Sequence, residues 1–324
     1  LVGSEMCIRD RPRAHRCIFV LNELPDLQPR IQVSLFSILE EKEIQIRGFK
    51  VRLPLDIQFI FTSNPEDYTN RGSIVTPLKD RIGSQILTHY PESVDIAKTI
   101  TSQESKLNSK TISKIHIPEI ARDIIEQVSF EARESELVDK KSGVSARMSI
   151  TSLQNLVSSA ERRMLINKEE TTSIRMSDFN SVISSINGKV ELVYEGEEEG
   201  AEQVSYNLIS DAVKTLFIKY FPKIEKLTKP DEISVYDSIL EWFTVNQVIL
   251  RDDLSNKDYE SILNKVKDAD SILNKFIPDI DKKDKLFFIE FLLWGLEGFN
   301  KLTIMRTNNG VEFKDPFNNF INKI

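Results

Sequence analysis

The chain has 324 residues, of which 40% are hydrophobic, and its 43 basic and 50 acidic side chains give a net charge of −7. This length and apolar content predict two or three packed domains, and the negative balance argues against a general nucleic-acid binder. The longest apolar stretch, residues 286–294, is far below the ~20 residues that a membrane span needs. Only two cysteines occur, so no disulfide framework is implied and a cytoplasmic protein is expected.

Residues 1–12 are expected to form a tail outside the fold. Their opening segment, LVGSEMCIRDR, lacks the apolar core and the cleavage site of a secretory signal. It looks like a translated sequencing-adapter peptide, and a natural disordered tail is the alternative. If the peptide is an adapter, the natural gene continued upstream and this chain has lost its true beginning.

Residues 13–90 alternate strand and helix signals, which predicts an α/β core. Two apolar, β-branched runs, at 17–21 and 56–62, predict strands that are buried on both faces of a sheet. A third, weaker strand is predicted at 84–90.

Proline and glycine define the elements between these strands. Pro29 is tolerated in the first turn of a helix whose leucines and isoleucines share one stripe. The alternating run at 43–53 turns around Gly48 and predicts a β-hairpin. Thr76 is expected to cap a second helix, which has Pro77 at its first position.

The rest of the chain is expected to be helical. The spacing of apolar residues predicts an all-α lid over 91–188, in which Ser149 and Ser177 cap the last two helices. Clustered glutamates at 189–203 predict a solvated linker, with an acidic docking segment as the alternative. The final 122 residues hold 17 of the 27 aromatic side chains. Aromatic stripes of this kind favour a packed helical bundle, which we assign to 204–324.

Polar residues follow each of the first two predicted strands. Asn22 and Glu23 come directly after the first strand, and Asn64 follows the second. The carboxyl ends of parallel strands meet at one edge of the sheet, where ligands of open α/β folds bind. In a nucleoside-triphosphate hydrolase, such residues hold Mg²⁺, polarise the attacking water and contact the terminal phosphate. The alternatives are polar strand ends without a role and, at Asn64, a turn-forming Asn-Pro pair.

Arg81 ends the next short helix, where a surface arginine paired with Asp80 is the alternative to a functional role. Taken in order, the segments AHRCIFVLNELPDL, FIFTSNPED and PLKDRIG resemble the AAA+ ATPases of the MoxR and magnesium-chelatase-subunit-I clade. The resemblance spans residues 14–187. It implies an AAA+ P-loop NTPase sheet that lacks its first strands, followed by a helical lid.

The resemblance also implies roles for four catalytic residues. Glu23 is the Walker B glutamate, a general base for water, and Asn64 is the sensor-1 residue. Arg81 is the arginine finger that completes the site of a neighbouring subunit. Arg147, in the segment SARM, is the sensor-2 residue that touches the γ-phosphate of the nucleotide.

ATP and Mg²⁺ are the cofactors that the resemblance implies, and hydrolysis is coupled to remodelling of a partner protein. The expected partners are further copies of the chain in a ring, typically a hexamer, and a protein with a von Willebrand factor A-type domain. Insertion of Mg²⁺ into a porphyrin is a narrower activity for which the sequence offers no sign.

The sequence departs from the clade in two respects. Asn22 stands where most relatives carry the Walker B aspartate, so it would hold Mg²⁺ through a water molecule and without adding charge. No G-x-x-x-x-G-K-[ST] occurs in the chain, so the cradle that binds phosphate is missing. We therefore expect a truncated product that is inactive alone.

Truncation would also make the fragment poorly stable. In the AAA+ sheet order 5-1-4-3-2, the absent first strand lies between the strands predicted at 84–90 and 56–62, so both lose a backbone partner. A different class of function stays open, namely a non-catalytic interaction scaffold that uses the helical bundle at 204–324.

Overall fold

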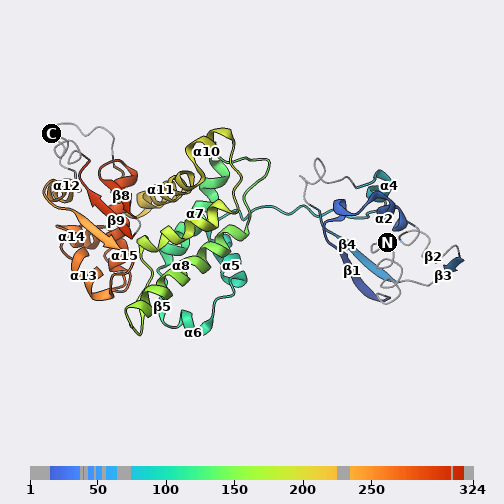
Figure 1. Ribbon diagram of the computed structural model, residues 1–324, viewed down its shortest axis with the longest axis horizontal. Helices are drawn as coiled ribbons and strands as arrows, with labels where there is room; N and C mark the ends of the chain where they lie inside the picture. The colour runs from blue at the N-terminus through green and yellow to red at the C-terminus, as the bar shows by residue number, and fades with distance from the viewer. Residues whose placement is uncertain are drawn as a thin grey trace. The chain divides into compact units, whose positions relative to one another are not determined.

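The computed structural model describes residues 15–36, 39, 43–46, 49–52, 56–63, 74–224, 234–307 and 309–316. The chain divides into two compact units, Leu1–His89 and Tyr90–Ile324 (Figure 1). Within the described ranges, no helix is both long enough and apolar enough to cross a membrane. The tail predicted at residues 1–12 lies outside these ranges.

The first unit is an α/β arrangement built around one pair of parallel strands. Strand β1 pairs with β4 along its whole length, from Cys17 opposite Ile57 to Leu21 opposite Phe61. Strands β2 and β3 form the predicted antiparallel hairpin. The elements in chain order are β1 (Cys17–Leu21), the 3₁₀ turn η2 (Leu24–Asp26), α2 (Pro29–Ser34), β2 (Glu43–Ile46), β3 (Phe49–Arg52), β4 (Ile57–Phe61) and α4 (Thr76–Asp80).

A proline lies in the first turn of both helices of this unit, but Pro77 is the second residue of α4 and not, as the sequence predicts, the first. Pro29 is the first residue of α2, where its missing N–H costs no hydrogen bond. Helix α4 begins at Thr76 itself, so the prediction that Thr76 is the N-cap is wrong by one residue. Val75 takes the N-cap position, and its backbone N–H donates to the buried Gln32 Oε1 over 2.9 Å.

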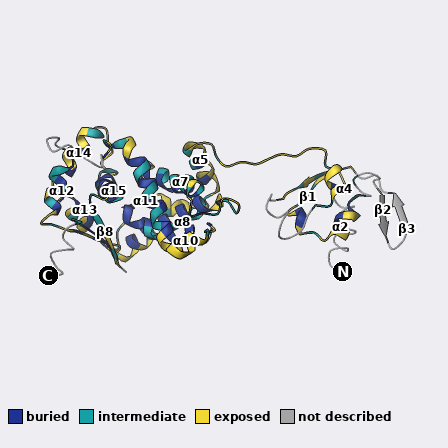
Figure 2. Cartoon of the chain, turned by 90° about the horizontal axis from the view of Figure 1, so that it is seen from above, coloured by how far each residue is buried: buried dark blue, intermediate teal, exposed yellow. Residues whose placement is uncertain are grey.

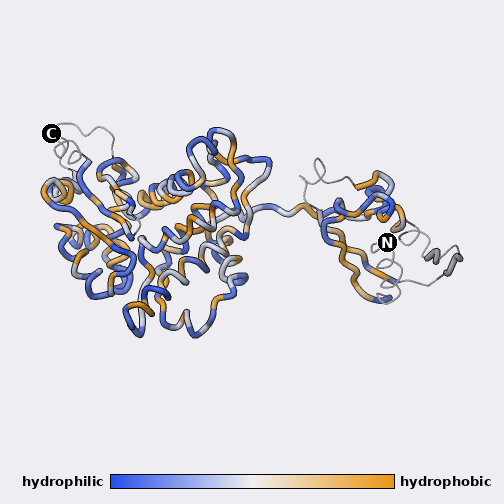
Figure 3. Tube along the Cα trace, viewed as in Figure 1, coloured by the Kyte–Doolittle hydropathy of each residue, from blue (hydrophilic) through white to orange (hydrophobic). Residues whose placement is uncertain are grey.

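The prediction that both strands are buried on both faces is wrong for this chain. Ile18, Val20 and Ile60 are 64%, 51% and 44% exposed. Among the described residues of this unit, Leu24, Leu35 and Leu78 form one small buried hydrophobic cluster. Apolar strands need a layer of structure on each face to be buried, and the described residues supply little of it. Figure 3 accordingly shows β1 and β4 as apolar, while Figure 2 shows little buried surface in the unit.

The strand predicted at 84–90 does not form. This segment has no strand pairing, and all of its residues are exposed. Ile86 and Leu87 are 88% and 78% exposed. A single strand has unpaired backbone groups on both sides, so an apolar, β-branched run becomes a strand only where a neighbour can pair with it.

The second unit begins with the helices of the predicted lid. Its longest members, α7 and α8, pack against each other and against α5. Two short parallel strands, β5 and β6, join the loops at one end. The elements are α5 (Val94–Glu104), α6 (Ser109–Ile112), β5 (Ile115–His116), α7 (Glu119–Glu134), α8 (Arg147–Ile166), β6 (Thr172–Ser173), the 3₁₀ helix η4 (Met176–Val182) and α9 (Ile183–Asn187).

Neither serine predicted as an N-cap in this region has that position. Ser149 lies inside the first turn of α8, whose N-cap is Ala146, and its buried hydroxyl bonds to that of Ser129 over 2.7 Å. Ser177 lies inside η4, and Arg175 precedes that helix. Both serines are buried polar residues that pair inside the unit, which a capping pattern alone cannot distinguish.

The residues expected to form a solvated linker, 189–203, are folded. They contain α10 (Tyr194–Glu199) and the start of α11 (Ala201–Tyr220), and Val190 and Leu192 make isolated β-bridges to the residues before α8. Gly196 explains the close packing, because a Cβ there would lie 2.6 Å from the carbonyl oxygen of Leu137. The glutamates lie on the exposed side of a packed helix.

The C-terminal part contains a sheet as well as helices, so the prediction of a purely helical bundle is wrong. Strand β9 pairs antiparallel with β7 on one side and β8 on the other. Gly310, at φ +149°, approaches the carbonyl oxygen of Leu250 so closely that a Cβ would lie 2.1 Å from it. The elements are α12 (Asp237–Phe243), β7 (Val248–Arg251), α13 (Asn256–Leu263), α14 (Ala269–Phe276), α15 (Lys285–Gly298), β8 (Thr303–Thr307) and β9 (Gly310–Lys314).

One hydrophobic core runs through the whole second unit, from the lid helices to the C-terminal sheet. Helix α15 is buried almost all round, which is typical of a central helix. Phe217 of α11 packs at 4.9 Å from Phe221 and 6.2 Å from Phe291, measured between ring centroids. The dark blue segments of Figure 2 follow this core. The aromatic residues are core, as the sequence predicts, but the core is shared with the lid.

Candidate functional site

The carboxyl ends of β1 and β4 bring the predicted edge residues together. Beyond the last strand pair, the Thr62 N–H donates to the carbonyl of Leu21 over 3.0 Å, and the Leu24 N–H donates to the carbonyl of Thr62 over 2.9 Å. These bonds continue the parallel ladder past the strands and clamp the segment from Leu21 to Leu24 against Thr62. Asn22 and Glu23, which lie between them, are therefore fixed at the edge of the pair by backbone register.

Glu23 lies at this edge in a strained backbone conformation. Its φ of 54° and ψ of 54° are in the left-handed region, which costs a residue with a Cβ about 1–2 kcal/mol. The hydroxyl of Thr62 accepts the Glu23 N–H over 3.0 Å and helps to hold this conformation. The Glu23 side chain is exposed, so its carboxylate faces solvent at the carboxyl edge, where the chemistry of a general base requires it.

Thr62 is the organising residue of the edge, and the sequence reasoning did not identify it. Besides accepting the Glu23 N–H, its hydroxyl donates to Asn22 Oδ1 over 3.3 Å. One hydroxyl thus orients both polar residues of the first strand. The signal for it was available, because a threonine directly after a second parallel strand points to the same edge as the residues that follow the first.

Asn64, the predicted sensor-1 residue, lies outside the described residues, as does the rest of the loop to residue 73. The structure follows the chain to Ser63, directly beyond the clamp at Thr62. The predicted pairing of Asn64 with Glu23 therefore stays a prediction.

Arg81, the predicted arginine finger, caps the C-terminal end of α4 in the same unit. Its Nη1 donates to the carbonyl of Pro77 over 2.6 Å, and its guanidinium lies 5.0 Å from the ring centroid of Phe36. These contacts hold the side chain half-buried against its own unit. Release from them is required before this arginine can reach any phosphate of a neighbour.

Arg147, the predicted sensor-2 residue, belongs to the second unit. It is the first residue of α8, as the motif predicts, and its side chain is exposed. Its backbone N–H lies 3.3 Å from the hydroxyl of Ser145. A cationic side chain at the start of a long helix adds to the positive end of the helix dipole, so this terminus favours an anionic group.

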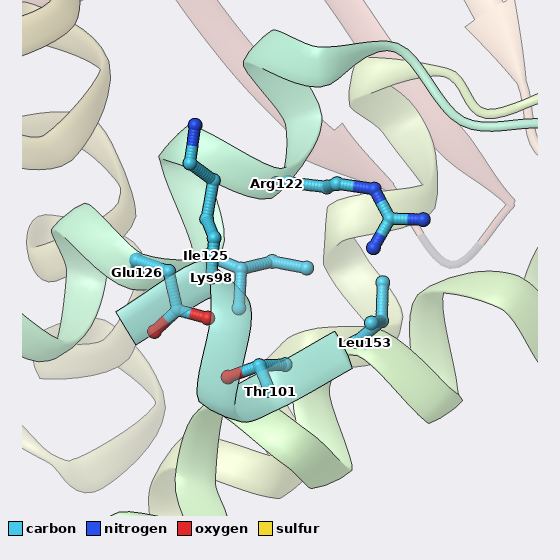
Figure 4. A pocket seen from close by; sticks show the side chains of 6 residues that line it. All are labelled: Lys98, Thr101, Arg122, Ile125, Glu126 and Leu153. Atoms are coloured by element: carbon cyan, nitrogen blue, oxygen red, sulfur yellow. The ribbon is translucent and has the colours of Figure 1, made fainter. Parts of the chain in front are cut away.

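A small cavity in the second unit is too small to be a ligand site. Its volume of about 10 Å³ is room for one water molecule. Figure 4 shows its lining residues, among them Lys98, Thr101 and Glu126. Burial raises the pKa of Glu126, while hydrogen bonds from Thr101 and Ser149 oppose that rise. The cavity is best explained as a packing defect around a buried carboxyl.

A second buried acid, Glu290 of α15, links three elements of this unit. It accepts the backbone N–H groups of Met176 and Ser177 over 3.0 and 2.9 Å, and the hydroxyl of Tyr259 over 2.5 Å. Complete burial raises the pKa of Glu290 to about 7, against the opposing effects of Tyr259 and Arg175. Its bonds satisfy the open end of η4, so its role is structural. These hydrogen bonds explain why Glu290 interrupts the apolar stretch 286–294.

The edge of the first unit supplies oxygen ligands of the kind that Mg²⁺ accepts together with water. These are the amide of Asn22, the carboxylate of Glu23 and the nearby Thr62 hydroxyl. Among the described residues, no group of three His, Cys, Asp or Glu side chains could hold a metal by itself. The phosphate side of an ATP site needs a glycine-rich cradle with a lysine, and the sequence contains no such motif. The residues of this chain therefore fit the magnesium and water side of such a site but not ATP itself.

Comparison with known proteins bears on the domain that carries these edge residues. Residues 6–82 match the AAA domain of the dynein-related subfamily, which supports an AAA+ ATPase core in the first unit. The match begins inside the segment that we expected to be an adapter peptide. No curated protein matches the chain.

One solved structure that resembles the chain is a presumed ATPase from Cytophaga hutchinsonii ATCC 33406. It has 19% sequence identity and a TM-score of 0.25, and the alignment covers 59% of this chain and 64% of that chain. The chain thus spans less than two thirds of that protein, and the likeness adds nothing to the argument from the site.

Proposed function

We propose that the chain belongs to an AAA+ ATPase of the MoxR and magnesium-chelatase-like group, which couples ATP hydrolysis to the remodelling of a partner protein. The single observation that carries the proposal is the edge of the β1–β4 pair, where Glu23 is held in a left-handed conformation next to Asn22 and Thr62. The AAA domain match over residues 6–82 supports it.

In this proposal each predicted residue keeps its role in the complete enzyme. Glu23 is the general base, Asn64 senses the terminal phosphate, and Asn22 holds Mg²⁺ through a bound water. Arg147 contacts the nucleotide from the helical lid. Arg81 serves a neighbouring subunit, which makes hydrolysis depend on a ring, with six subunits as the expected number. A protein with a von Willebrand factor A-type domain is the proposed partner.

The 324 residues of this chain are proposed to be inactive alone. Their sequence lacks the phosphate cradle, so neither ATP binding nor turnover is expected from the purified chain. The decisive protein is the gene product extended at its N-terminus. If the codons upstream of Arg13 do not encode G-x-x-x-x-G-K-[ST], the ATPase proposal fails and a non-catalytic scaffold remains.

The test uses two single variants of the extended protein, Glu23→Gln and Arg81→Ala. Each alone is expected to abolish ATP turnover, because an arginine supplied by a neighbour contributes about 10³–10⁵ in rate in related phosphoryl-transfer enzymes. Mixed in equal amounts and reassembled, the two variants are expected to recover activity. In a ring of head-to-tail contacts, about a quarter of the interfaces then combine an intact Glu23 with an intact Arg81.

The mixing experiment separates the parts of the proposal. Loss of turnover in both variants without recovery on mixing would show that Arg81 acts within its own subunit or only supports the fold. Full turnover in Glu23→Gln would remove the general base and with it the enzyme assignment. Circular dichroism of each variant, compared with the unmodified protein, controls for loss of structure.

A further inference from the structure

A large groove lies in the second unit, and none of the residues proposed for catalysis line it. Its volume is about 630 Å³, within the range of ligand sites, about 300–1,000 Å³. Its walls come from the β5 and β6 strands with their flanking residues, from α13, and from the turn that leads into α15 (Figure 1). We call it the basic groove, and its lining residues are 112–116, 171–175, Asn256, Tyr259, Glu260, Asn264, Lys282, Lys283 and 285–287.

The groove has a positive net charge, whereas the whole chain has a negative one. Lys114, Lys282 and Lys283 line it with exposed side chains, and none of the three has an ion-pair partner within the described residues. Lys285 also lines it and is paired with Asp270 over 2.9 Å. Glu260 is the acidic residue of the lining. In a protein with a net charge of −7, this local excess of positive charge favours an anionic ligand.

The Arg175 guanidinium and the His116 ring of the groove already have hydrogen-bond partners. Arg175 is buried, and its guanidinium donates to the carbonyl of Leu254 over 2.9 Å and to Asn256 Oδ1 over 3.1 Å. His116 Nε2 lies 2.5 Å from Asp284 Oδ1. The positive charge that remains for a ligand is therefore carried by flexible lysines on two walls. This spread of charge suits an extended ligand with several separate negative groups better than one compact phosphate.

The lining residues also distinguish a single-stranded nucleic acid from an acidic peptide as the extended anionic ligand. A single-stranded nucleic acid needs exposed aromatic faces on which bases stack. In the lining, Tyr259 and Phe287 are 4% and 2% exposed and offer no such face, and the ring of His116 is hydrogen-bonded to Asp284. The walls instead combine hydroxyl and amide groups, such as those of Thr171, Ser173 and Asn264, with aliphatic surface. Hydroxyl and amide groups can hydrogen-bond to a peptide backbone, and aliphatic surface can contact its side chains.

We propose that the basic groove binds an acidic peptide segment of a partner protein in an extended form. The carboxylates of the peptide lie against Lys114 on one wall and against Lys282 and Lys283 on the other. The proposal does not depend on ATP hydrolysis, because every residue that carries it lies in the second unit.

The test measures the fluorescence anisotropy of a labelled ten-residue peptide of alternating Glu and Ser, titrated with the full 324-residue chain. Saturable binding is expected, and the triple variant Lys114→Glu, Lys282→Glu, Lys283→Glu should weaken it about tenfold or more. The matched control is Lys140→Glu, Lys141→Glu, Lys219→Glu, which changes the net charge equally at exposed lysines outside the groove. The control should bind the peptide within about twofold of the unmodified chain.

Three outcomes would overturn the proposal. Failure of the peptide to saturate the chain would remove the site. Equal weakening of binding in both triple variants would reduce the effect to overall charge. Tighter binding of inorganic polyphosphate or single-stranded DNA of equal charge, lost only in the groove variant, would reassign the groove to phosphate. All six lysines are exposed, so thermal unfolding of both variants should match that of the unmodified chain.

Discussion

The left-handed conformation of Glu23 makes a specific prediction, namely that removing this glutamate stabilises the first unit. Glu23→Gly takes away the Cβ that makes φ 54° costly, while Glu23→Gln keeps the Cβ and removes only the charge. The glycine variant should therefore be more stable than the starting protein. The glutamine variant should be close to neutral, because the side chain is exposed.

The magnitude follows from two opposing terms. Relief of the left-handed conformation gains about 1–2 kcal/mol, and the greater freedom of glycine in the unfolded chain costs about 0.5–1 kcal/mol. The net stabilisation is then about 0–1.5 kcal/mol with a midpoint of about 0.75 kcal/mol, which raises the protection of the β1 and β4 amides about three- to fourfold. Hydrogen exchange followed by mass spectrometry measures this protection in the peptides that cover Cys17–Leu21 and Ile57–Phe61.

Asp26→Gly is the matched control, because Asp26 is exposed in the same unit but lies in the ordinary helical conformation of η2. Glycine there gains nothing and should lower protection. If Glu23→Gly lowers protection as much as Asp26→Gly does, the strain is not real and the argument that the edge holds Glu23 for a purpose is refuted. Protection that rises equally in Glu23→Gln would assign the effect to charge instead.

Three further predictions concern the stability of the two units. Gly295→Ala should destabilise the second unit by about 2 kcal/mol in a denaturant titration, because its Cβ would lie 2.0 Å from the buried Phe217 ring. Gly298→Ala should cost less, because its Cβ would lie 2.8 Å from Lys214 Cγ and 3.4 Å from Ser210 Oγ, which are side-chain atoms that can shift. Glu290 has a pKa of about 7 in the fold against an ordinary 4.5, so its contribution to stability is full below pH 4.5 and is lost as the pH rises through 7. A loss of roughly 3 kcal/mol over this range should be absent in Glu290→Gln; equal pH profiles would contradict it. Amides of Ile57–Phe61 should exchange faster than those of the buried C-terminal helices, since β4 pairs only with β1 among the described strands.

The first unit shows which parts of a fold a sequence can predict. Local composition predicts the strands at 17–21 and 56–62 and the proline that begins α2. The alternation of strand and helix signals predicts that the two strands are parallel. Burial of the strands does not follow, because it depends on layers that other segments must supply. Ile18 reads as a core residue and is 64% exposed.

The second unit shows how local signals are overridden by packing. The glutamates of 189–203 indicate solvent, yet one glycine, Gly196, allows α10 to pack against the residues before α8. The C-terminal part carries a hairpin signal beside its aromatic residues, because Gly310, the first residue of β9, directly follows the turn from β8. Ser149 was expected to be a cap and is a buried partner of Ser129.

The candidate site was predictable in its position but not in its geometry. Strand ends place Asn22 and Glu23 at one edge, and the parallel register of β1 and β4 confirms that edge. The strand end also places Thr62 at this edge, but the orientation of its hydroxyl and the left-handed backbone of Glu23 could not be predicted. Both arise from hydrogen bonds between segments about forty residues apart, which local spacing does not encode.

These contacts bear on Asn22, which in the proposed ATPase takes the place of the Walker B aspartate. Asn22 Oδ1 accepts the Thr62 hydroxyl, and an aspartate oxygen would accept the same bond, so the substitution changes the charge at the edge and leaves its geometry in place. Weaker Mg²⁺ binding is the expected consequence, whereas the position of Glu23 is unaffected because it is set by the backbone bonds to Thr62. A scaffold that had lost catalysis would have no use for a glutamate in a conformation costing about 1–2 kcal/mol. The persistence of that strain at the sheet edge favours the ATPase over the scaffold.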